Sequence, residues 1–324
     1  MKLKNSILGI GVASYNEVDA LAVSVKSLVQ CKKYFASVGI NLQIQISDNY
    51  SDQERITKIK KLCLQNQIIF SSNIRNMGFG ANLFKLLKNS HSKYILIIGC
   101  GEVVDPYNLE KLNRILTYHD LNNVFFKFGM VLGDRKSIST DFGENFEISK
   151  ILRVNPAISL NIWNAKLIDH KLRPANISND WAHIELAATI DSMHPELNSF
   201  VFHESLVRLY QPTEGWYTSK DFLTIILRFD SLIEKFPNIS LGPRIGNNVV
   251  VICWWIYNYR LVSDERMSLK MVLPLLIRVR SHPKAVLQFI LISQTPFRFI
   301  RFVIKIRTGF FIHNTRKSYF RFRD

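Results

Sequence analysis

Cysteine is scarce in this 324-residue chain, and its copies are widely spaced. The four, Cys31, Cys63, Cys100 and Cys253, form no CxxC pair. Neither a disulfide framework nor a zinc site is therefore indicated, and we expect a reducing compartment. Low-complexity tracts and internal repeats are also missing, which argues against a disordered or solenoid protein.

Long apolar runs are missing as well. No stretch reaches the roughly 20 uninterrupted apolar residues that a helix needs to cross a bilayer. The basic start, Met1–Lys4, is followed by a short apolar run at 7–13 that leads into polar residues. We expect a first strand there and not a signal peptide. Apolar residues still make up 47% of the chain, enough for one large core or two smaller ones.

Acidic residues are in short supply, 26 against 42 Lys and Arg, which gives a formal charge of +16. The imbalance is concentrated in residues 217–324, where 18 basic and 6 acidic side chains contribute +12 and leave +4 for the first 216 residues. This asymmetry predicts a catalytic or binding domain followed by an anion-seeking tail.

The first 130 residues alternate between strand and helix patterns. Between short apolar runs, apolar residues recur at helical spacing. This alternation predicts an α/β fold with a mostly parallel sheet and helices on both faces. The runs that predict the strands are 7–14, 42–46, 68–70, 94–98 and 123–128. Later on, residues 161–167 predict a strand running into a helix, 179–190 a helix, and 201–210 a last strand.

Beyond Gly215 the pattern changes to helices alone. We therefore expect an α/β domain at 1–215 and a helical, basic C-terminal region at 216–324. Within that region, residues 297–307 interleave Arg and Lys with Phe and Ile, which suits a segment lying in a membrane interface. Each basic side chain near an anionic leaflet contributes about 1 kcal/mol, so several would hold the chain there. An ordinary solvated face is the alternative.

Two sequence signals mark helix starts. Ser51-Asp52-Gln53-Glu54 matches a capping box, with Ser51 as the N-cap. Asp105-Pro106 matches an N-cap followed by proline at the first helical position.

Polar side chains cluster where the expected strands end. In a parallel sheet these ends share one edge, and ligands of open α/β sheets bind there. Gly78 and the turn Gly99-Cys100-Gly101 would let a ligand approach the backbone, and Glu102 could face a hard cation. We therefore predict a nucleotide-sugar site. Its clusters are Tyr15-Asn16-Glu17, Asp48-Asn49, Asn73-Arg75-Asn76 and Glu102.

Four segments resemble, in the same order, the motifs of family 2 glycosyltransferases, which are inverting enzymes with the nucleotide-binding GT-A fold. Val12–Glu17 is similar to the first-strand signature, and Ile46–Asp52 to the DN-x-S-x-D turn. Asn73–Asn82 is similar to the N-x-G-x-x-x-N helix start. Asn179-Asp180-Trp181 is similar to the ED-W helix that carries the catalytic base. The resemblance stops before the C-terminal third.

The resemblance implies roles for the matching positions. Asp48 would hydrogen-bond the base, Arg75 would lie near base or phosphate, and Asp180 would deprotonate the acceptor hydroxyl, with His183 and Glu185 as fallback bases. A positioned base of this kind accelerates the reaction roughly 10²–10⁴-fold. The donor site would comprise Ser14, Tyr15, Asn16, Glu17, Asp48, Asn49, Arg75, Asn76, Gly78, Asn82 and Gly101. Against these roles, Asp48 and Asn49 could be turn formers only, Asp180 a helix cap and Gly78 a packing residue. For Glu185, a charge that faces solvent or the acceptor is the favoured interpretation.

One motif departs from the family. Where the family usually has Asp-x-Asp, this chain has Gly99-Cys100-Gly101, and Glu102 is the only carboxylate left in the turn. A Mg²⁺ or Mn²⁺ ion would neutralise the leaving nucleoside diphosphate. We assign that metal to Glu102, with His203 as a second ligand. The alternatives are a weakly held metal, basic side chains in its place, a Glu102 that only caps the turn, and a His203 that is an ordinary strand histidine.

The sequence therefore predicts a glycosyltransferase that moves a sugar from a nucleotide-diphosphosugar donor to a saccharide acceptor linked to polyprenyl diphosphate. The expected setting is bacterial surface polysaccharide synthesis, of lipopolysaccharide O-antigen or capsule, by a cytoplasmic enzyme peripheral to the inner face of the cell membrane. A catalytically inactive sugar-nucleotide-binding homologue is the alternative. Nucleic acid is not an expected partner despite the charge, because no RRM, KH or helix-turn-helix signature is present.

Overall fold

A computed structural model of the chain describes residues 4–131, 142–144, 161–168, 182–202 and 204–209. Two predicted site residues, Asp180 and His203, lie outside the described residues, as does the whole region 216–324. The division at 215 and the interfacial segment at 297–307 therefore stay predictions.

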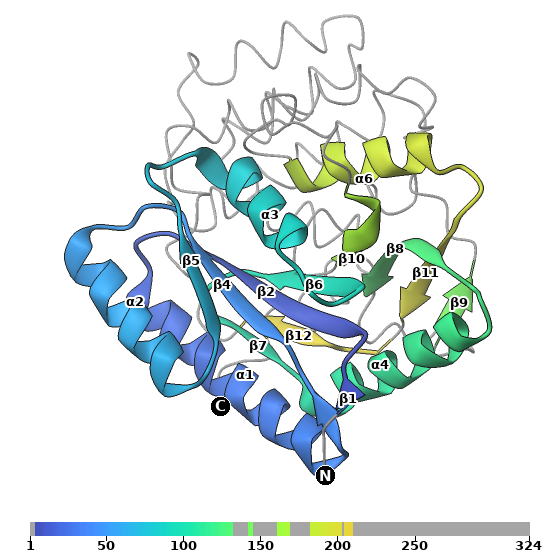
Figure 1. Cartoon of the computed structure of the whole chain (residues 1–324), viewed down its shortest axis with the longest axis horizontal. Coiled ribbons are helices and arrows are strands. Elements are labelled where there is room, and N and C mark those ends of the chain that lie inside the picture. The colour runs from blue at the N-terminus through green and yellow to red at the C-terminus, as the bar shows by residue number, and fades with distance from the viewer. Residues whose placement is uncertain (1–3, 132–141, 145–160, 169–181, 203, 210–324) are drawn as a thin grey trace, which may run out of the picture. The chain divides into compact units, whose positions relative to one another are not determined.

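An eight-stranded sheet in the order β5-β4-β2-β6-β10-β8-β11-β9 forms the centre of the fold (Figure 1). Its first four strands are parallel: β5 (Ile69–Ser72), β4 (Ile44–Asp48), β2 (Leu8–Ser14) and β6 (Tyr94–Ile98). β10 (Asn161–Asn164) is antiparallel to both β6 and β8 (Phe126–Val131). β11 (Asn198–Phe202) is parallel to β8, and β9 (Phe142–Glu144) is antiparallel to β11. The predicted mostly parallel sheet is confirmed.

Helices cover both faces of the sheet, as predicted (Figure 1). On one face lie α1 (Val18–Ser37), α2 (Gln53–Gln65) and α4 (Pro106–Leu121). On the other, α3 (Gly78–Lys88) packs on β2 and β4, and α6 (Ala182–Met193) packs on α3. The chain runs from β2 through β4 to β5 at the edge of the sheet. It then returns through α3 to β6, which lies on the other side of β2.

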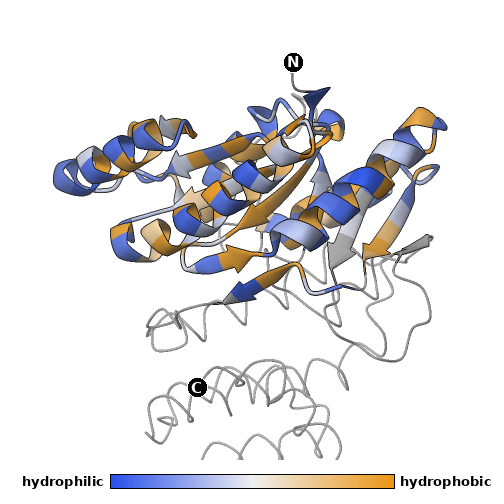
Figure 2. Ribbon diagram, turned by 90° about the horizontal axis from the view of Figure 1, so that it is seen from below, coloured by the Kyte–Doolittle hydropathy of each residue, from blue (hydrophilic) through white to orange (hydrophobic). Residues whose placement is uncertain are grey.

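The core lies on both faces of the central strands. β4 and β6 are buried along their whole length, and β2 almost so, which explains why they appear in the sequence as continuous apolar runs. α1 buries Leu21, Leu28 and Phe35 against them, and each such side chain contributes about 1.5–3 kcal/mol. In Figure 2 the helices alternate between polar and apolar segments along the ribbon, whereas the strands carry long apolar segments.

Two small sheets flank the large one, and one corrects a prediction. β1 (Lys4–Asn5) pairs with β3 (Ile40–Asn41), and β7 (Glu102–Val104) pairs with β12 (Val207–Leu209). A single strand over 201–210 was wrong, because β11 and β12 belong to different sheets. The segment between β11 and β12 is bound by the start of α4 instead of continuing along the large sheet. The Asp105 amide donates to the Leu206 carbonyl at 2.9 Å, and the Asn108 side chain donates to the Ser205 carbonyl at 2.8 Å.

The predicted helix starts have opposite outcomes. Asp105 is the N-cap of α4 and Pro106 its first residue, as expected, and the Asp105 Oδ1 accepts the Asn108 N–H at 2.9 Å. At α2 the predicted cap was wrong by one residue: Asp52 accepts the Arg55 N–H at 2.9 Å. The Ser51 hydroxyl is used elsewhere, because it donates to Asp48 and accepts the Asn16 N–H. The strand running into a helix at 161–167 is confirmed as β10 followed by a 3₁₀ turn, Ala165–Leu167.

Gly129 offers a direct test of the β8–β11 packing. A Cβ atom added there would lie 2.1 Å from the Phe200 Cζ, and that buried ring already packs edge-on against Phe126, with centroids 5.1 Å apart. Gly129→Ala must therefore displace the Phe200 ring and should lower the free energy of unfolding by about 1–3 kcal/mol. Urea denaturation measures the loss, and adding Phe200→Leu should restore part of it. Unchanged stability of Gly129→Ala would show that the strands do not pack this closely.

Candidate functional site

The ends of β2, β4, β5 and β6 meet at one edge of the sheet, so the predicted convergence of polar clusters is confirmed. Backbone hydrogen bonds extend the ladders past the strands: the Asn49 amide donates to the Ser14 carbonyl at 2.8 Å, and the Asn73 amide to the Asp48 carbonyl at 2.9 Å. On the other side of β2, the Cys100 thiol lies 3.5 Å from the Ala13 carbonyl oxygen. Four loops that are distant in sequence therefore form one continuous rim.

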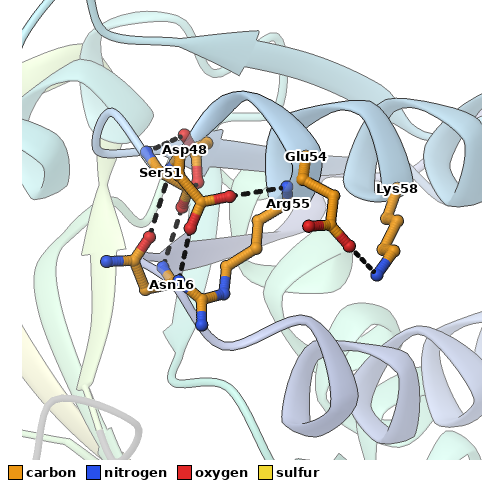
Figure 3. Close-up of polar contacts among 7 residues, drawn as sticks. Asn16, Asp48, Ser51, Glu54, Arg55 and Lys58 are labelled. Carbon is orange, nitrogen blue, oxygen red and sulfur yellow. Dashed lines mark hydrogen bonds and ion pairs between the residues drawn. The ribbon is translucent and has the colours of Figure 1, made fainter.

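Asp48 is fully buried at this edge, and its carboxylate holds the following turn (Figure 3). Its Oδ1 accepts the Ser51 hydroxyl at 2.5 Å, and its Oδ2 accepts the Ser51 amide at 2.8 Å. The Ser51 Oγ in turn accepts the Asn16 amide at 2.8 Å. The turn-forming role considered for Asp48 is thus present, and through Ser51 it also fixes the loop after β2. The hydrogen bond from Asp48 to a base stays a prediction.

Asparagine side chains join the second and third loops. The Asn49 Oδ1 accepts the Asn73 side-chain amide at 2.9 Å and the Met77 N–H at 3.0 Å. The Asn49 Nδ2 donates to the Asn76 Oδ1 at 2.8 Å, and that same oxygen accepts the Gly78 N–H at 2.9 Å. Two asparagines therefore supply the cap that Met77, the residue before α3, does not provide with its own side chain.

Asn82 and Lys85 anchor α3 to the sheet from the same helix face. The buried Asn82 donates its side-chain amide to the Ser47 carbonyl at 2.9 Å. The Lys85 Nζ donates to the Ser72 carbonyl at 2.8 Å and to the Asn73 Oδ1 at 3.0 Å. Burial lowers the pKa of Lys85, and the nearby Asp48 charge acts in the opposite direction. The sequence analysis missed Lys85; its signal was a lysine three residues after Asn82 on an otherwise apolar helix face.

Each of the four rim loops contains a residue with left-handed backbone. The φ angles are +56° at Asn16, +70° at Tyr50, +81° at Gly78 and +83° at Gly101. Glycine adopts this conformation freely and asparagine readily, whereas a bulky side chain does so only under strain. Two of the glycines predicted for ligand approach, Gly78 and Gly101, are thus required by the turns themselves, whereas Gly99 has no such backbone requirement. Tyr50 is the exception among the four left-handed residues.

The turn after β6 brings two carboxylates close to a thiol. The Glu102 Oε2 accepts the Gly99 N–H at 2.7 Å, so Glu102 does cap the turn, and the Gly101 amide donates to the Ala20 carbonyl at 3.0 Å. Burial raises the pKa of the Cys100 thiol to about 12, and the charges of Glu17 and Glu102 add to the increase. Burial of the Glu17 carboxyl raises its pKa as well, partly offset by its hydrogen bond with Cys100. A raised carboxyl pKa means that ionisation of Glu17 costs stability as pH rises through that pKa.

The side chains at this turn that could ligate a metal ion fit one that is held jointly with a substrate. Among the described residues, no three His, Cys, Asp or Glu side chains are grouped as a metal cage. The Cys100 thiol stays protonated near neutral pH, and only a thiolate binds metal. Mg²⁺, however, is commonly bound by one or two carboxylates together with substrate phosphates. Glu102 can serve as such a ligand, while His203 stays untested.

The helix that follows Asp180 in sequence, α6, packs on α3. His183 and Glu185, at the start of α6, are buried, and the His183 ring meets the Phe79 ring of α3 edge-on, with centroids 6.1 Å apart. The interpretation of Glu185 as a solvent-facing charge is therefore wrong, because its side chain is buried together with most of α6. The alternative, a charge on the acceptor side, stays a prediction. Within the described ranges, no helix is both long and apolar enough to cross a membrane.

The environment of Cys100 predicts its reactivity. A pKa raised from 9.0 to about 12 leaves about a thousandfold less thiolate at pH 8. Iodoacetamide should therefore modify Cys100 in the folded chain far more slowly than in the chain unfolded in urea. Peptide mass spectrometry identifies the modified cysteine in each case. Equal rates in the two states would contradict the burial of Cys100 between Glu17 and Glu102.

Comparisons with known proteins agree with this architecture. Residues 10–171, half of the chain, match the family model described as glycosyl transferase family 2. A comparison with curated protein sequences gives no match.

Solved structures also share the fold. The chain is similar to a mannosyltransferase from Pyrobaculum calidifontis in complex with GDP-Man and Mn²⁺, at a TM-score of 0.54 and 11% identity over 89% of this chain and 86% of that one. It is also similar to S. aureus TarS 1–349, at a TM-score of 0.50 and 11% identity over 91% of each chain. Against the longer TarS structure it spans about half of that protein's length, 54%.

At such identities the solved structures show the fold alone, and the family rests on the sequence match. That match covers β2, β4, β5, β6 and the loops that build the rim. The chain belongs to glycosyl transferase family 2 and is a glycosyltransferase with the GT-A fold.

Proposed function

We propose that the chain transfers a sugar, with inversion, from a nucleotide-diphosphosugar to a lipid-linked saccharide acceptor. The observation that carries the proposal is the rim of four loops at the carboxyl edge of the parallel strands, held in place by the Asp48–Ser51–Asn16 chain of hydrogen bonds. Ligands of open α/β sheets bind at such an edge. The similar mannosyltransferase was solved with GDP-Man and Mn²⁺, which supports a sugar nucleotide as the donor.

The donor lies across the rim in this proposal. Ser14 to Glu17, Asp48 and Asn49 border the nucleoside, and the exposed Arg75 neutralises phosphate or meets the base edge. Asn76, Gly78 and Asn82 shape the start of α3 beside it. Gly101 leaves room for the diphosphate at the turn after β6.

Glu102 would hold the divalent cation together with the donor diphosphate. A Mg²⁺ or Mn²⁺ ion there stabilises the charge that develops on the leaving nucleoside diphosphate. The Glu102 carboxylate also keeps the Gly99–Gly101 turn in shape, so that its backbone stays open toward the phosphates.

Asp180 is the proposed general base. It accepts the proton of the acceptor hydroxyl as that oxygen attacks the anomeric carbon. The bond from the anomeric carbon to the diphosphate oxygen breaks on the opposite side, and the nucleoside diphosphate leaves. An in-line displacement of this kind inverts the configuration. The packing of His183 on Phe79 holds the helix after Asp180 against the donor-side helix α3.

The proposed acceptor is a saccharide on polyprenyl diphosphate, in the synthesis of bacterial O-antigen or capsule at the inner face of the cell membrane. The basic residues 217–324, with 18 Lys and Arg against 6 Asp and Glu, support this choice. Such an excess attracts both an anionic leaflet and the diphosphate of the acceptor.

Asp180→Asn tests the base. Because the amide cannot accept the hydroxyl proton, transfer should fall by roughly 10²–10⁴-fold, while the affinity for nucleoside diphosphate stays the same. Product formation from a panel of nucleotide sugars and calorimetric titration measure the two quantities. Asp191→Asn is the control, since that carboxylate pairs with Lys127 at 2.6 Å and its loss should lower stability but not turnover. Undiminished transfer in Asp180→Asn would remove Asp180 from the mechanism, and binding without any turnover in the wild type would favour an inactive homologue.

Glu102→Gln tests the metal assignment. The glutamine oxygen can still accept the Gly99 N–H, so the turn should stay folded while a charged ligand is lost. We expect the Mn²⁺ concentration for half-maximal transfer to rise about 10- to 100-fold. The control is Glu196→Gln, an exposed carboxylate that lies 3.4 Å from the His194 ring nitrogen. An unchanged metal requirement would leave Glu102 with the capping role alone.

A further inference from the structure

Tyr50 combines a strained backbone with an exposed aromatic ring. Its φ of +70° lies in the left-handed region, which a bulky aromatic residue adopts only under strain. The turn after β4 requires this backbone conformation, but glycine or asparagine would supply it at less cost. The fold alone therefore gives no reason for a tyrosine at this position.

Packing does not compensate for the strain. Tyr50 is 52% exposed and does not belong to the hydrophobic core, although its neighbours Asp48, Asn49 and Ser51 are all buried. Backbone strain that the surrounding structure maintains without a packing gain is found at ligand-binding sites. The ring is thus presented to solvent from a rigidly held turn.

A second exposed ring stands on the neighbouring loop. Ser14 and Asp48 are paired at the ends of β2 and β4, and Tyr15, 46% exposed, follows one residue later. The two loops are tied by the bonds from the Asn49 amide to the Ser14 carbonyl and from the Asn16 amide to the Ser51 Oγ, both 2.8 Å. Adjacent parallel strands lie about 4.8 Å apart, so the two rings stand on adjacent loops of the rim.

The position of Tyr50 along the rim indicates which part of a donor it meets. The strand order β4-β2-β6 places the Tyr50 turn two strand spacings, about 10 Å, from the Glu102 turn. In a nucleotide sugar, the ribose separates the base from the diphosphate by a comparable length. A donor whose diphosphate lies at the turn after β6 therefore places its base over β4.

We propose that Tyr50 is a further binding residue of the donor site, whose ring packs against the nucleobase. This inference rests on the proposed function and deepens it. A flat, half-exposed ring suits a base because every base has a π-face. The rigid turn keeps the ring in place before the donor arrives, so little side-chain freedom is lost on binding.

Tyr50→Gly separates the two effects of the residue, because they have opposite signs. Removing the strain should raise the thermal midpoint by a few degrees. Removing the ring should weaken binding of the base-bearing ligands by about 5- to 100-fold, the range for base stacking on an aromatic side chain. The probes are UDP, GDP and dTDP, titrated calorimetrically into the full chain. Inorganic pyrophosphate, which has no base, should bind both proteins equally.

Two further variants isolate the ring from loop flexibility. Tyr50→Asn has no ring but tolerates the left-handed backbone, and it should lose as much affinity as Tyr50→Gly. Tyr50→Phe keeps the ring and should bind as the wild type does. Weakening in the glycine variant alone, or an equal loss of pyrophosphate binding, would overturn the inference. If the wild type binds none of the three diphosphates, the proposed function itself fails; if it binds and Tyr50→Asn binds equally well, only the role of Tyr50 fails.

Discussion

A single buried carboxylate organises the functional edge. Asp48 has no solvent exposure, and a buried charge is tolerated only when hydrogen bonds satisfy it. The Ser51 amide and hydroxyl supply those bonds at 2.8 and 2.5 Å, and hydrogen bonds to a charged group each contribute about 1.5–3 kcal/mol. Because the Ser51 oxygen also accepts the Asn16 amide, the charge that shapes one loop fixes the next. The asparagine network continues the rim toward α3. The positions of the loops after β2, β4 and β5 therefore depend on one another.

Much of this arrangement was predictable from the sequence, because fully buried strands and strongly periodic helices leave clear patterns. The runs at 94–98 and 7–14 correspond to β6 and β2 almost residue for residue. The clustering of polar residues at strand ends followed from the parallel topology. The short strand β7 was not predictable, since three residues carry no periodicity and Glu102 pairs with a strand more than a hundred residues away. Tertiary contacts likewise decided the break between β11 and β12.

The side-chain network was less accessible than the fold. Ser51 carries the sequence signal of a helix cap, yet it serves Asp48, and Asp52 takes the cap because it stands one residue nearer the helix. Lys85 was missed because its partners, the Ser72 carbonyl and the Asn73 side chain, are defined only once α3 has docked on the sheet. The strain at Tyr50 is also invisible in the sequence, where DNYS resembles any polar turn. Sequence patterns therefore locate the rim, whereas the hydrogen bonds within it follow only from the three-dimensional packing of the loops.

The turn after β6 contains a single carboxylate, Glu102. Two glycines and a protonated thiol stand where the family usually has an Asp-x-Asp motif, and Glu102 both caps the turn and carries the remaining charge. We infer that this turn and the loops after β2, β4 and β5 form one nucleotide site. Hydrogen–deuterium exchange of the full chain, with and without UDP, GDP or dTDP in the presence of Mn²⁺, measures this. Residues 14–17, 48–52, 73–78 and 99–102 should be protected together by at least one of the three ligands. Protection confined to one of these loops, or found only on α4, would contradict it.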